Sequence, residues 1–434
     1  MATTYLSRSI SAGNLKKWTF SGWFKKSSNG SELRLTSSSD NSSYDDNIRF
    51  NSNDTITIIF RNAGVLTTNR KFSDNSAYYH IVVKVDTDQS AVNDRIILYV
   101  NGIDERVNGY STDSLPGQGL TGYINSNAFY IGVTNPSANS NHFNGIMSHV
   151  HFTDGYAYDA SAFGETDATT GEWRINASPS ITMGTNGFTI LKDGNTITDQ
   201  SSNSNNFSLG GGTLTNTEDC PSNVFAILNA ITPSSNNNRA GGTRHFNNSG
   251  GYDMRHSTLA VTKGKYYAEF YIADMTGGFT IVGIQDTSQF DDYNFMTNSS
   301  RGYGYRSDGT KGNNNSSSSF GNSFTSGDYI GVAVDLDNNK IYFSKNGVWQ
   351  NSGDPTSGAT GTGSAFDITD NYDYCIATSS NDAGTDQITD VNFGNGYFNV
   401  TAVSSAGTNA SGNGIFEYDV PTGFTALSTK GLNK

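Results

Sequence analysis

The sequence predicts an all-β protein made of two tandem β-sandwiches joined by a strand-poor connector. Three observations support this prediction. Short runs of alternating apolar and polar residues recur, and no long amphipathic helical pattern accompanies them. The polar residues are chiefly Asn, Ser, Thr and Gly, which favour turns and strand edges, and 23 Tyr and 25 Phe accompany them. The acidic residues are mostly Asp, which favours turns, rather than Glu, which favours helices.

The strand-like runs form two dense sets, separated by a region with few clear strands at about 160–245. Short strands with turn residues between them are typical of antiparallel sandwiches. At 434 residues, the chain is long enough for two or three domains, each with its own core. The first set is Trp18–Lys25, Thr55–Arg61, His80–Val85, Ile96–Val100, Phe129–Val133 and Ile146–Phe152, and the second is Tyr266–Ile272, Thr280–Ile284, Tyr329–Val334, Lys340–Ser344, Tyr374–Thr378 and Ile388–Phe393.

The two sets share a strand–turn–strand pattern. Val83–Asp88 and Val332–Asp337 both read Val-x-Val-Asp-x-Asp. Each is followed by a loop, a strand and an Asn-Gly pair, which begins at Asn101 in the first set and at Asn346 in the second. Asn-Gly supplies the two positive-φ residues of a type I′ hairpin turn. The pattern is either a weak internal repeat or a common device used twice, and both interpretations predict two sandwiches of similar layout.

Several stretches resemble two known domain families. Those that fit a SPRY domain in order and spacing are Gly264–Phe270, Ile281–Ile284, Gly302–Tyr305, Gly327–Asp335, Ile341–Gly347 and Val391–Gly394. Those similar to a laminin-G-like domain are Phe20–Lys26, Tyr79–Val83, Leu98–Gly102 and Gly145–Phe152. The resemblance implies two concanavalin-A-like jelly-roll β-sandwiches at residues 1–165 and 246–400. A connector at 166–245 and a C-terminal tail at 401–434 complete the expected organisation.

The region between the two sandwiches contains unusual strings, namely Phe163–Trp173, Gly184–Phe188 and Asp219–Asn229. They resemble the connector in large virion proteins of tailed phages, notably marine ones. That family usually shows Thr-Pro-Thr-Asn-Asn-Phe where this chain has Cys-Pro-Ser-Asn-Val-Phe at 220–225. The resemblance implies a virion surface protein, either a tail fibre, an adhesin or a capsid decoration, made in the cytoplasm of the host bacterium. Its expected partners are other virion proteins, further copies of itself, and a glycan or protein of the host surface.

The arrangement of acidic residues favours a non-enzymatic role. Glycosidases generally need two carboxylates that flank the scissile bond, and a Glu-x-Asp-x-Glu string would place them on one strand face. That string is absent, and no two of the seven Glu lie two or four residues apart. A purely structural virion component is the alternative, and a carbohydrate-cleaving depolymerase is a third hypothesis. The net charge of −13 argues against nucleic-acid binding, and no apolar run reaches the length of a membrane span.

Aromatic residues in expected loops are the candidates for ligand binding. They are Tyr293, Phe295, Phe320 and Trp349, and Asn and Ser surround several of them. Aromatic rings stack on the apolar faces of sugars, while amides and hydroxyls supply hydrogen bonds. Packing in the core is the competing interpretation for each ring.

Two residue pairs are candidates for a metal ion. His149 and His151 flank Val150, so on a strand both imidazoles would face the same side. Asp86 and Asp88 lie where a strand turns and would supply oxygen ligands to calcium. Ordinary strand packing of the histidines and a turn-capping role for the aspartates are the competing interpretations. Calcium is the single cofactor that the sequence brings into question.

Overall fold

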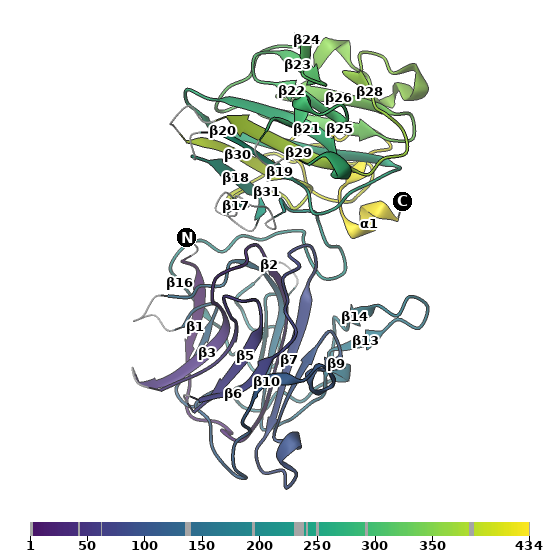
Figure 1. Ribbon diagram of the computed structural model, residues 1–434. Helices are drawn as coiled ribbons and strands as arrows, with labels where there is room; N and C mark the ends of the chain where they lie inside the picture. The colour runs from purple at the N-terminus through teal and green to yellow at the C-terminus, as the bar shows by residue number, and fades with distance from the viewer. Residues whose placement is uncertain are drawn as a thin grey trace. The chain divides into compact units, whose positions relative to one another are not determined.

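The protein folds almost entirely as β-strands and loops, as its computed structural model shows (Figure 1). The chain divides into two compact units, residues 1–216 and 217–434. Among the described residues, no helix is long and apolar enough to cross a membrane. The structure describes residues 3–41, 44–61, 63–134, 140–192, 196–229, 238–239, 242–248, 251–290, 294–381 and 386–433.

Unit 1 is a sandwich of an eight-stranded sheet and a six-stranded sheet. The eight-stranded sheet runs in the order β10 (Tyr110–Asp113), β6 (Ala63–Thr68), β5 (Ile56–Phe60), β4 (Tyr44–Phe50), β3 (Leu33–Asn41), β11 (Ala128–Ile131), β1 (Tyr5–Ser9) and β16 (Ser208–Gly210). The six-stranded sheet runs in the order β15 (Phe188–Ile190), β12 (Gly145–Asp154), β2 (Lys17–Lys26), β7 (Tyr79–Asp86), β8 (Ile96–Val100) and β9 (Ile103–Asp104). A separate hairpin joins β13 (Gly164–Thr166) to β14 (Trp173–Ile175).

The core of unit 1 fills the space between these two sheets. Alternate residues of β5, Ile56, Ile58 and Phe60, are buried in it because successive side chains of a strand point to opposite faces. Trp18 and Phe20 of β2 contribute to the same core from the other sheet. The alternating pattern of the sequence therefore identifies the inward face of each long strand.

Unit 2 is also a two-sheet sandwich. Its nine-stranded sheet contains β17 (Asn238–Arg239), β18 (Arg244–Asn247), β30 (Gln387–Asn392), β20 (Lys265–Met275), β25 (Tyr329–Asp335), β26 (Lys340–Lys345) and β27 (Val348–Trp349) in that order, with β28 (Phe366–Asp367) on β26 and β33 (Thr425–Ala426) on β20. Its six-stranded sheet runs in the order β19 (Tyr252–His256), β29 (Tyr374–Asn381), β21 (Phe279–Asp286), β22 (Gly302–Arg306), β23 (Thr310–Asn313) and β24 (Ser316–Ser319). A two-stranded pair, β31 (Tyr397–Phe398) and β32 (Thr401–Ala402), and a short helix, α1 (Thr429–Leu432), complete the regular elements discussed below.

The prediction of two all-β sandwiches is confirmed, and so is their similar layout, which both interpretations of the shared pattern predict. Strands β12-β2-β7-β8-β9 of unit 1 and β30-β20-β25-β26-β27 of unit 2 follow the same order. Lys17 pairs with Asp86 across β2 and β7, and Lys265 pairs with Asp335 across β20 and β25. Each lysine also forms an ion pair with its aspartate, at 3.1 Å and 2.8 Å respectively. The second Val-x-Val-Asp motif therefore repeats both the strand order and the cross-strand ion pair of the first.

The two Asn-Gly pairs form equivalent turns. Asn101 and Asn346 have φ values of 50° and 48°, which asparagine tolerates better than most residues. Each asparagine side chain accepts a hydrogen bond, at 2.8 Å in both cases, from a backbone N–H of the neighbouring strand in the sheet, that of His80 in β7 and that of Tyr329 in β25. This bond attaches the turn to that neighbouring strand. The strands on either side of each turn pair with each other, β8 with β9 and β26 with β27, so the predicted hairpin signals are correct.

The segments between and after the sandwiches belong to the two units. β15 pairs with β12, and β16 extends the eight-stranded sheet beside β1. In the tail, β33 pairs in parallel with β20 of the nine-stranded sheet. The expected connector at 166–245 is thus shared between the units, and the expected tail at 401–434 is part of unit 2. These strands are only two or three residues long, too short to give an alternating pattern in the sequence.

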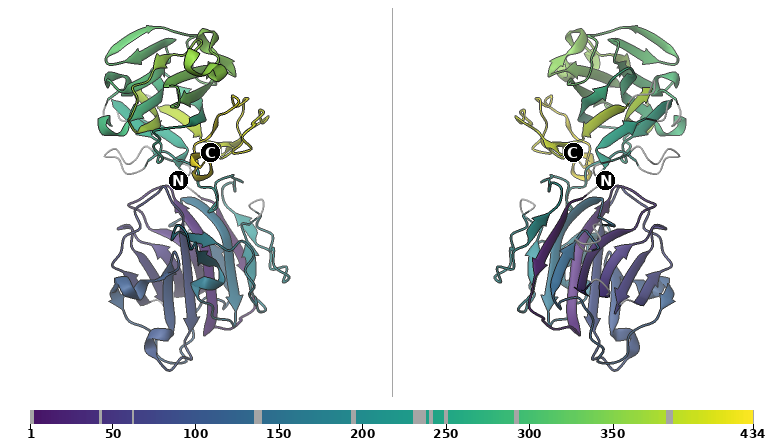
Figure 2. Two further views of the ribbon diagram at one scale, coloured as in Figure 1. Left: turned by 90° about the vertical axis from the view of Figure 1, so that its right-hand side faces the viewer. Right: turned by 90° about the vertical axis from the view of Figure 1, so that its left-hand side faces the viewer.

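In each unit, a segment of the chain covers the outer face of the sheet that contains the repeat. In unit 1, Phe163 and Trp173 pack over Val82 of β7. In unit 2, Phe416 and Phe424 of the C-terminal segment pack over Ala333 of β25. Figure 2 shows the yellow C-terminal segment beside the green strands of unit 2. The other sheet of each unit, eight-stranded in unit 1 and six-stranded in unit 2, carries one of the two surfaces that are described below.

Candidate ligand-binding surfaces

The outer face of the six-stranded sheet of unit 2 carries an aromatic cluster, formed by Tyr252, Phe279, Phe295 and Arg306. Tyr252 of β19 and Phe279 of β21 both pair with Asn381 of β29, so these residues form one row across the sheet. Arg306 of β22 lies in the next row on the same face, where it pairs with Ile281. Phe295 comes from the loop that follows β21 and precedes a 3₁₀ turn at Met296–Asn298.

The rings of the aromatic cluster contact one another. The centroids of Tyr252 and Phe295 are 4.8 Å apart in an edge-to-face arrangement, and those of Phe279 and Phe295 are 5.7 Å apart. The guanidinium of Arg306 lies 4.6 Å from the centroid of Phe279 and 5.7 Å from that of Phe295. Such cation–π contacts hold the guanidinium against the two rings, and the side chain of Arg306 is 21% exposed.

A small apolar layer supports the cluster, while its upper side faces solvent. Met254, Ile281 and Met296 are buried beneath it. Tyr252 is 45% exposed. The cluster therefore combines ring faces, a phenol hydroxyl and a guanidinium, with Asn381 in the same row. This combination suits a ligand that has an apolar face and polar edges, such as a sugar or a polar peptide.

Two of the other aromatic residues predicted to bind a ligand, Phe320 and Trp349, pack away from this cluster. Phe320 packs against the main core of unit 2, with its ring centroid 5.6 Å from that of Tyr305. Trp349 packs beside the C-terminal segment, with its centroid 6.3 Å from that of Tyr267. Tyr293 lies outside the described residues. Of the four predicted residues, the structure thus places Phe295 in an exposed aromatic cluster and gives Phe320 and Trp349 packing roles.

His149 and His151 lie on β12 at a bulge. His149 has a φ of 48°, and the pairing of β12 with β2 shifts between Ser148 and His151. The bulge interrupts the side-chain alternation from which the sequence predicted both imidazoles on one face of the strand. The two ring centroids are nevertheless close, 6.4 Å apart. His151 is buried, and its Nδ1 forms a 2.8 Å hydrogen bond with the Thr189 hydroxyl. Burial, with smaller effects of His149 and Lys192, lowers the pKa of His151 to about 3, so it is neutral.

A third histidine, His80, lies on the same outer face. Its ring stacks on Trp23, with 4.6 Å between centroids, and on Trp173, with 6.0 Å. The indole N–H of Trp173 donates to His80 Nδ1 at 3.0 Å, and His80 Nε2 lies 2.9 Å from the Ser21 hydroxyl. Because an indole only donates, Nδ1 is the acceptor and the proton resides on Nε2. Burial lowers the pKa of His80 to about 3, in agreement with this neutral form.

Trp173 is expected to stabilise unit 1 by holding the β13–β14 hairpin against the six-stranded sheet. Trp173→Ala removes both the ring stack and the hydrogen bond to His80, and we expect the free energy of unfolding of unit 1 to fall by about 1–3 kcal/mol. Trp173→Phe keeps a ring and loses only the N–H donor, so its loss should be about 1 kcal/mol. Urea unfolding of unit 1 provides the measurement, with exposed Glu172→Ala as the control. Equal stability of the alanine and wild-type proteins would contradict this role.

Asp86 and Asp88 are each engaged by a different lysine. Asp86 is buried, forms an ion pair with Lys17 at 3.1 Å and accepts a hydrogen bond from Gln89 at 2.9 Å. Burial alone would raise the pKa of Asp86, but the bonds from Gln89 and Lys17 outweigh it, and the pKa lies below its ordinary value. Asp88 is exposed and lies 3.3 Å from Lys16. The backbone N–H of Asp88 also bonds to the Asp86 carboxylate, so Asp86 caps this turn while Asp88 forms an ion pair with Lys16. Calcium binding at this pair stays a prediction.

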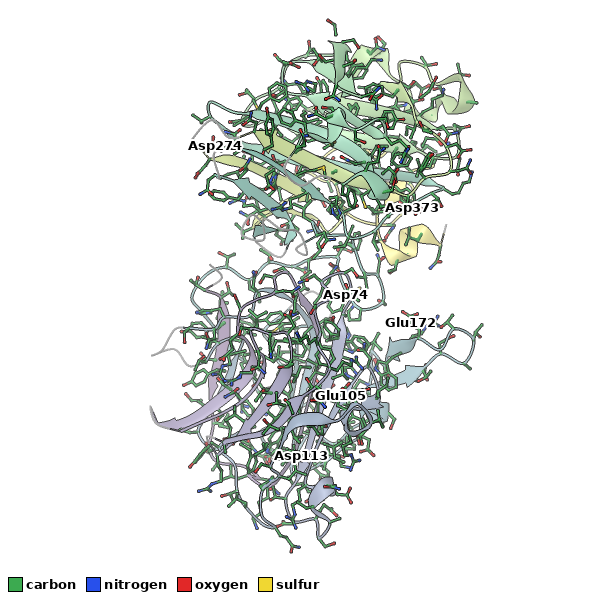
Figure 3. All side chains as sticks on the ribbon, in the orientation of Figure 1. Asp74, Glu105, Asp113, Glu172, Asp274 and Asp373 are labelled. Carbon is green, nitrogen blue, oxygen red and sulfur yellow. The ribbon has the colours of Figure 1, made fainter. Side chains whose placement is uncertain are left out.

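Carboxylates buried in the sandwiches are bonded to other groups of the chain. In unit 1, Figure 3 shows Asp74, Glu105, Asp113 and Glu172 well separated from one another. Among the described residues, no group of three or more His, Cys, Asp or Glu side chains is arranged to hold a metal ion. Buried acids with partners from the chain include Asp46 with the N–H of Tyr123, Glu105 with Arg70, Asp253 with Arg255, Asp286 with Arg301, Asp335 with Lys265 and Asp390 with Arg244.

Comparison with known proteins identifies a domain in each unit. Residues 3–161 match the model of the concanavalin A-like lectin/glucanases superfamily, and residues 265–366 match that of the SPRY domain. The chain contains a laminin-G-like, concanavalin A-like domain and a SPRY domain. Both are β-sandwiches, which confirms the predicted fold class. The matched regions lie in separate units, in the order expected from the sequence.

Individual proteins are similar to parts of the chain. An ATP-dependent RNA helicase, DDX1 of Xenopus laevis, is 37% identical over 91 residues, which are 21% of this chain and 12% of the helicase. The crystal structure of the SPRY domain of human HERC1 is 24% identical and covers 34% of this chain and 87% of its own, with a TM-score of 0.28. A second human SPRY domain structure is 20% identical and covers 35% of this chain and 91% of its own, with a TM-score of 0.27.

Proposed function

We propose that this chain is a non-enzymatic binding protein on the surface of a bacterial virus particle, where it contacts a glycan or a protein of the host surface. The observation that carries the proposal is the aromatic cluster on the outer face of the SPRY-domain unit. Exposed aromatic and arginine side chains dominate the binding energy of many recognition surfaces. Laminin-G-like and SPRY domains are often ligand-binding or adhesion modules, in agreement with this role.

The bonding of the acidic residues supports a role without catalysis. A general acid or base needs access to a substrate proton. Asp253, Asp286 and Asp390 are instead buried and bonded to arginine side chains of the same chain. These three carboxylates are therefore not available as a general acid or base, in agreement with the proposed binding role.

The proposed virion location rests on the resemblance of the connector strings, and of the domain pair that they join, to virion proteins of tailed phages. Other virion proteins and further copies of the chain are the partners that this location implies. A purely structural role in the particle is the competing proposal, and it requires no host ligand.

We expect the purified full-length chain to bind cells of the host bacterium and to slow adsorption of the intact virus. Tyr252→Ser should weaken cell binding by at least about 10-fold, because it removes the most exposed ring of the aromatic cluster. Tyr372→Ser is the matched control, since Tyr372 is also an exposed tyrosine of unit 2 and stacks on Arg301 with 4.0 Å between guanidinium and ring centroid. Flow cytometry with labelled protein measures the binding.

Two results would count against the proposal. Absence of the chain from purified virions, as judged by mass spectrometry, would contradict the location. Cell binding that Tyr252→Ser leaves unchanged would remove the aromatic cluster as the contact surface. Presence in the virion without any cell binding would favour the purely structural role.

A further inference from the structure

The eight-stranded sheet of unit 1 carries a groove on its outer face, of about 510 Å³. This volume falls within the range of roughly 300–1,000 Å³ that is typical of small-molecule sites. Its lining residues are Ser7, Arg8, Ser9, Ala128, Tyr130, Ser204, Asn205, Asn206 and Ser208. Four serines and two asparagines among these nine make the groove strongly polar.

The strand register explains how these side chains meet. Ser7 of β1 pairs with Tyr130 of β11 on one side and with Ser208 of β16 on the other. The three residues therefore form a row across the sheet. Leu6 and Phe129, which neighbour Ser7 and Tyr130 in the sequence, point into the core of unit 1, so the row faces outward.

The chain holds the end of the groove rigidly. The guanidinium of Arg8 donates to Asn205 Oδ1 and, at 3.3 Å, to the carbonyl oxygen of Asn186. The side-chain amide of Asn205 donates to the carbonyl oxygens of Thr185, at 2.9 Å, and Gly187, at 2.7 Å. A site whose lining is fixed before binding loses less conformational entropy when it takes a ligand.

Several polar groups in the groove remain available to a ligand. Within the described residues, the hydroxyls of Ser7, Ser9, Tyr130, Ser204 and Ser208 have no hydrogen-bond partner from the protein. Each hydroxyl is both a donor and an acceptor, and they surround one half-exposed aromatic ring. Arg8 pairs with Phe129, so strand alternation directs its side chain to the face opposite Ser7, where it interacts electrostatically with Asp199.

We propose that this groove binds a neutral saccharide unit. A pyranose presents alternating hydroxyls, which match donor–acceptor groups, and a face of C–H groups, which packs on an aromatic ring. A peptide is the less suitable occupant of the groove, because peptide sites use apolar pockets for side chains and this lining is largely polar. A peptide that paired with β16, the last strand of the described sheet, would be the competing occupant. Five of the nine lining residues lie within the region that matches the concanavalin A-like superfamily, and the other four, residues 204–206 and 208, lie beyond it.

The proposal is independent of the aromatic cluster in unit 2 and of the location of the protein. We expect saturation-transfer NMR of the full-length chain to detect binding of at least one of glucose, galactose and N-acetylglucosamine at millimolar concentration. Tyr130→Ala should weaken that binding at least about 10-fold, because it removes the stacking ring. Ser208→Trp should abolish it by filling the groove.

Ser178→Trp is the matched control, because Ser178 is an exposed serine of unit 1 outside the groove, and it should bind as the wild type does. Circular dichroism verifies that each variant folds, and Ser208→Trp decides the test if Tyr130→Ala does not fold. The proposal is overturned if none of the sugars binds, if glucuronic acid alone binds, or if both groove variants bind unchanged. Capture of a library peptide that Ser208→Trp blocks, without sugar binding, would identify a peptide site instead. Loss of sugar binding in Ser208→Trp with normal binding in Tyr252→Ser separates this groove from the proposed cell-contact surface.

Discussion

Asp253→Ala is expected to lower the free energy of unfolding of unit 2 by about 3–5 kcal/mol. The carboxylate of Asp253, on β19, contacts two side chains. Its Oδ1 lies 2.8 Å from Arg255 Nη1, and its Oδ2 lies 2.8 Å from His245 Nε2. The side chains of all three residues are 1% exposed. Because β18 carries His245 and β19 carries Asp253, the carboxylate links the two sheets at the edge of the sandwich. Its loss leaves the guanidinium of Arg255 buried without this counter-charge.

A compensating double variant tests this explanation. Asp253→Leu combined with Arg255→Met replaces the buried ions by apolar groups of similar size and should restore the stability to within about 2 kcal/mol of the wild type. Asp308→Ala is the control, since Asp308 is 45% exposed and lies 3.9 Å from Arg306, and such surface pairs contribute less than about 1 kcal/mol. Hydrogen exchange of unit 2 peptides reports the stability without interference from unit 1. Equal losses in the single and double variants would show that shape, rather than charge, determines the effect.

The long strands could be predicted because their inward faces are apolar. All twelve predicted runs coincide with strands of the structure, among them β2, β7, β20 and β25. Large parts of the eight-stranded sheet of unit 1 were missed, and so was β24 in the six-stranded sheet of unit 2. β3 contains a Ser-Ser-Ser-Asp run at 37–40, and β24 consists of four exposed serines, Ser316–Ser319. These residues favour turns when judged locally, and only pairing with neighbouring strands makes them extended.

The candidate sites were predictable only in part, because they depend on register between distant strands. Phe295 could be selected as an aromatic residue in a polar loop. Tyr252 and Arg306 give no such signal, and they reach Phe295 because β19 and β22 lie in the same sheet as β29 and β21. The groove of unit 1 depends on β16, a three-residue strand that has no alternating pattern of its own. In this protein, the core strands are therefore more predictable from the sequence than the surface sites are.

Glu269 of β20 is expected to make the stability of unit 2 fall as the pH rises. Its buried carboxyl accepts hydrogen bonds from the backbone N–H groups of Glu417, at 2.8 Å, and Tyr418, at 2.9 Å, and from the Tyr267 hydroxyl, at 3.0 Å. Burial raises the pKa of Glu269 to about 7, although these bonds favour the ionised form. Ionisation of the buried carboxyl thus costs more desolvation free energy than its hydrogen bonds offset, so the folded state of unit 2 is more stable while the carboxyl is neutral.

The direction of the effect follows from the two pKa values. The folded-state pKa of about 7 lies above the ordinary value of 4.5, so the contribution is fully present below pH 4.5 and is lost as the pH rises through 7. The expected loss is about 3 kcal/mol. His256 acts in the opposite direction, because burial lowers its pKa to about 4 and protonation below pH 6.5 destabilises the folded state. The pH profile of the wild type alone therefore does not isolate Glu269.

Glu269→Gln isolates this contribution, because glutamine stays uncharged at every pH while His256 is unchanged. Its –NH2 group cannot accept the backbone N–H bond that one carboxyl oxygen accepts, so we expect the variant to be less stable than the wild type near pH 5. The difference between the two free energies of unfolding should then shift in favour of the variant by up to about 3 kcal/mol between pH 5 and pH 8, because only the wild type loses stability. Hydrogen exchange of peptides that contain Glu417 and Tyr418 should show the same difference, when wild type and variant are compared at equal pH. Glu218→Gln, at an exposed position of unit 2, should follow the wild-type profile. A stability difference between Glu269→Gln and the wild type that stays constant from pH 5 to pH 8 would mean that Glu269 does not titrate in this range, and the C-terminal segment would then be held equally firmly at both pH values.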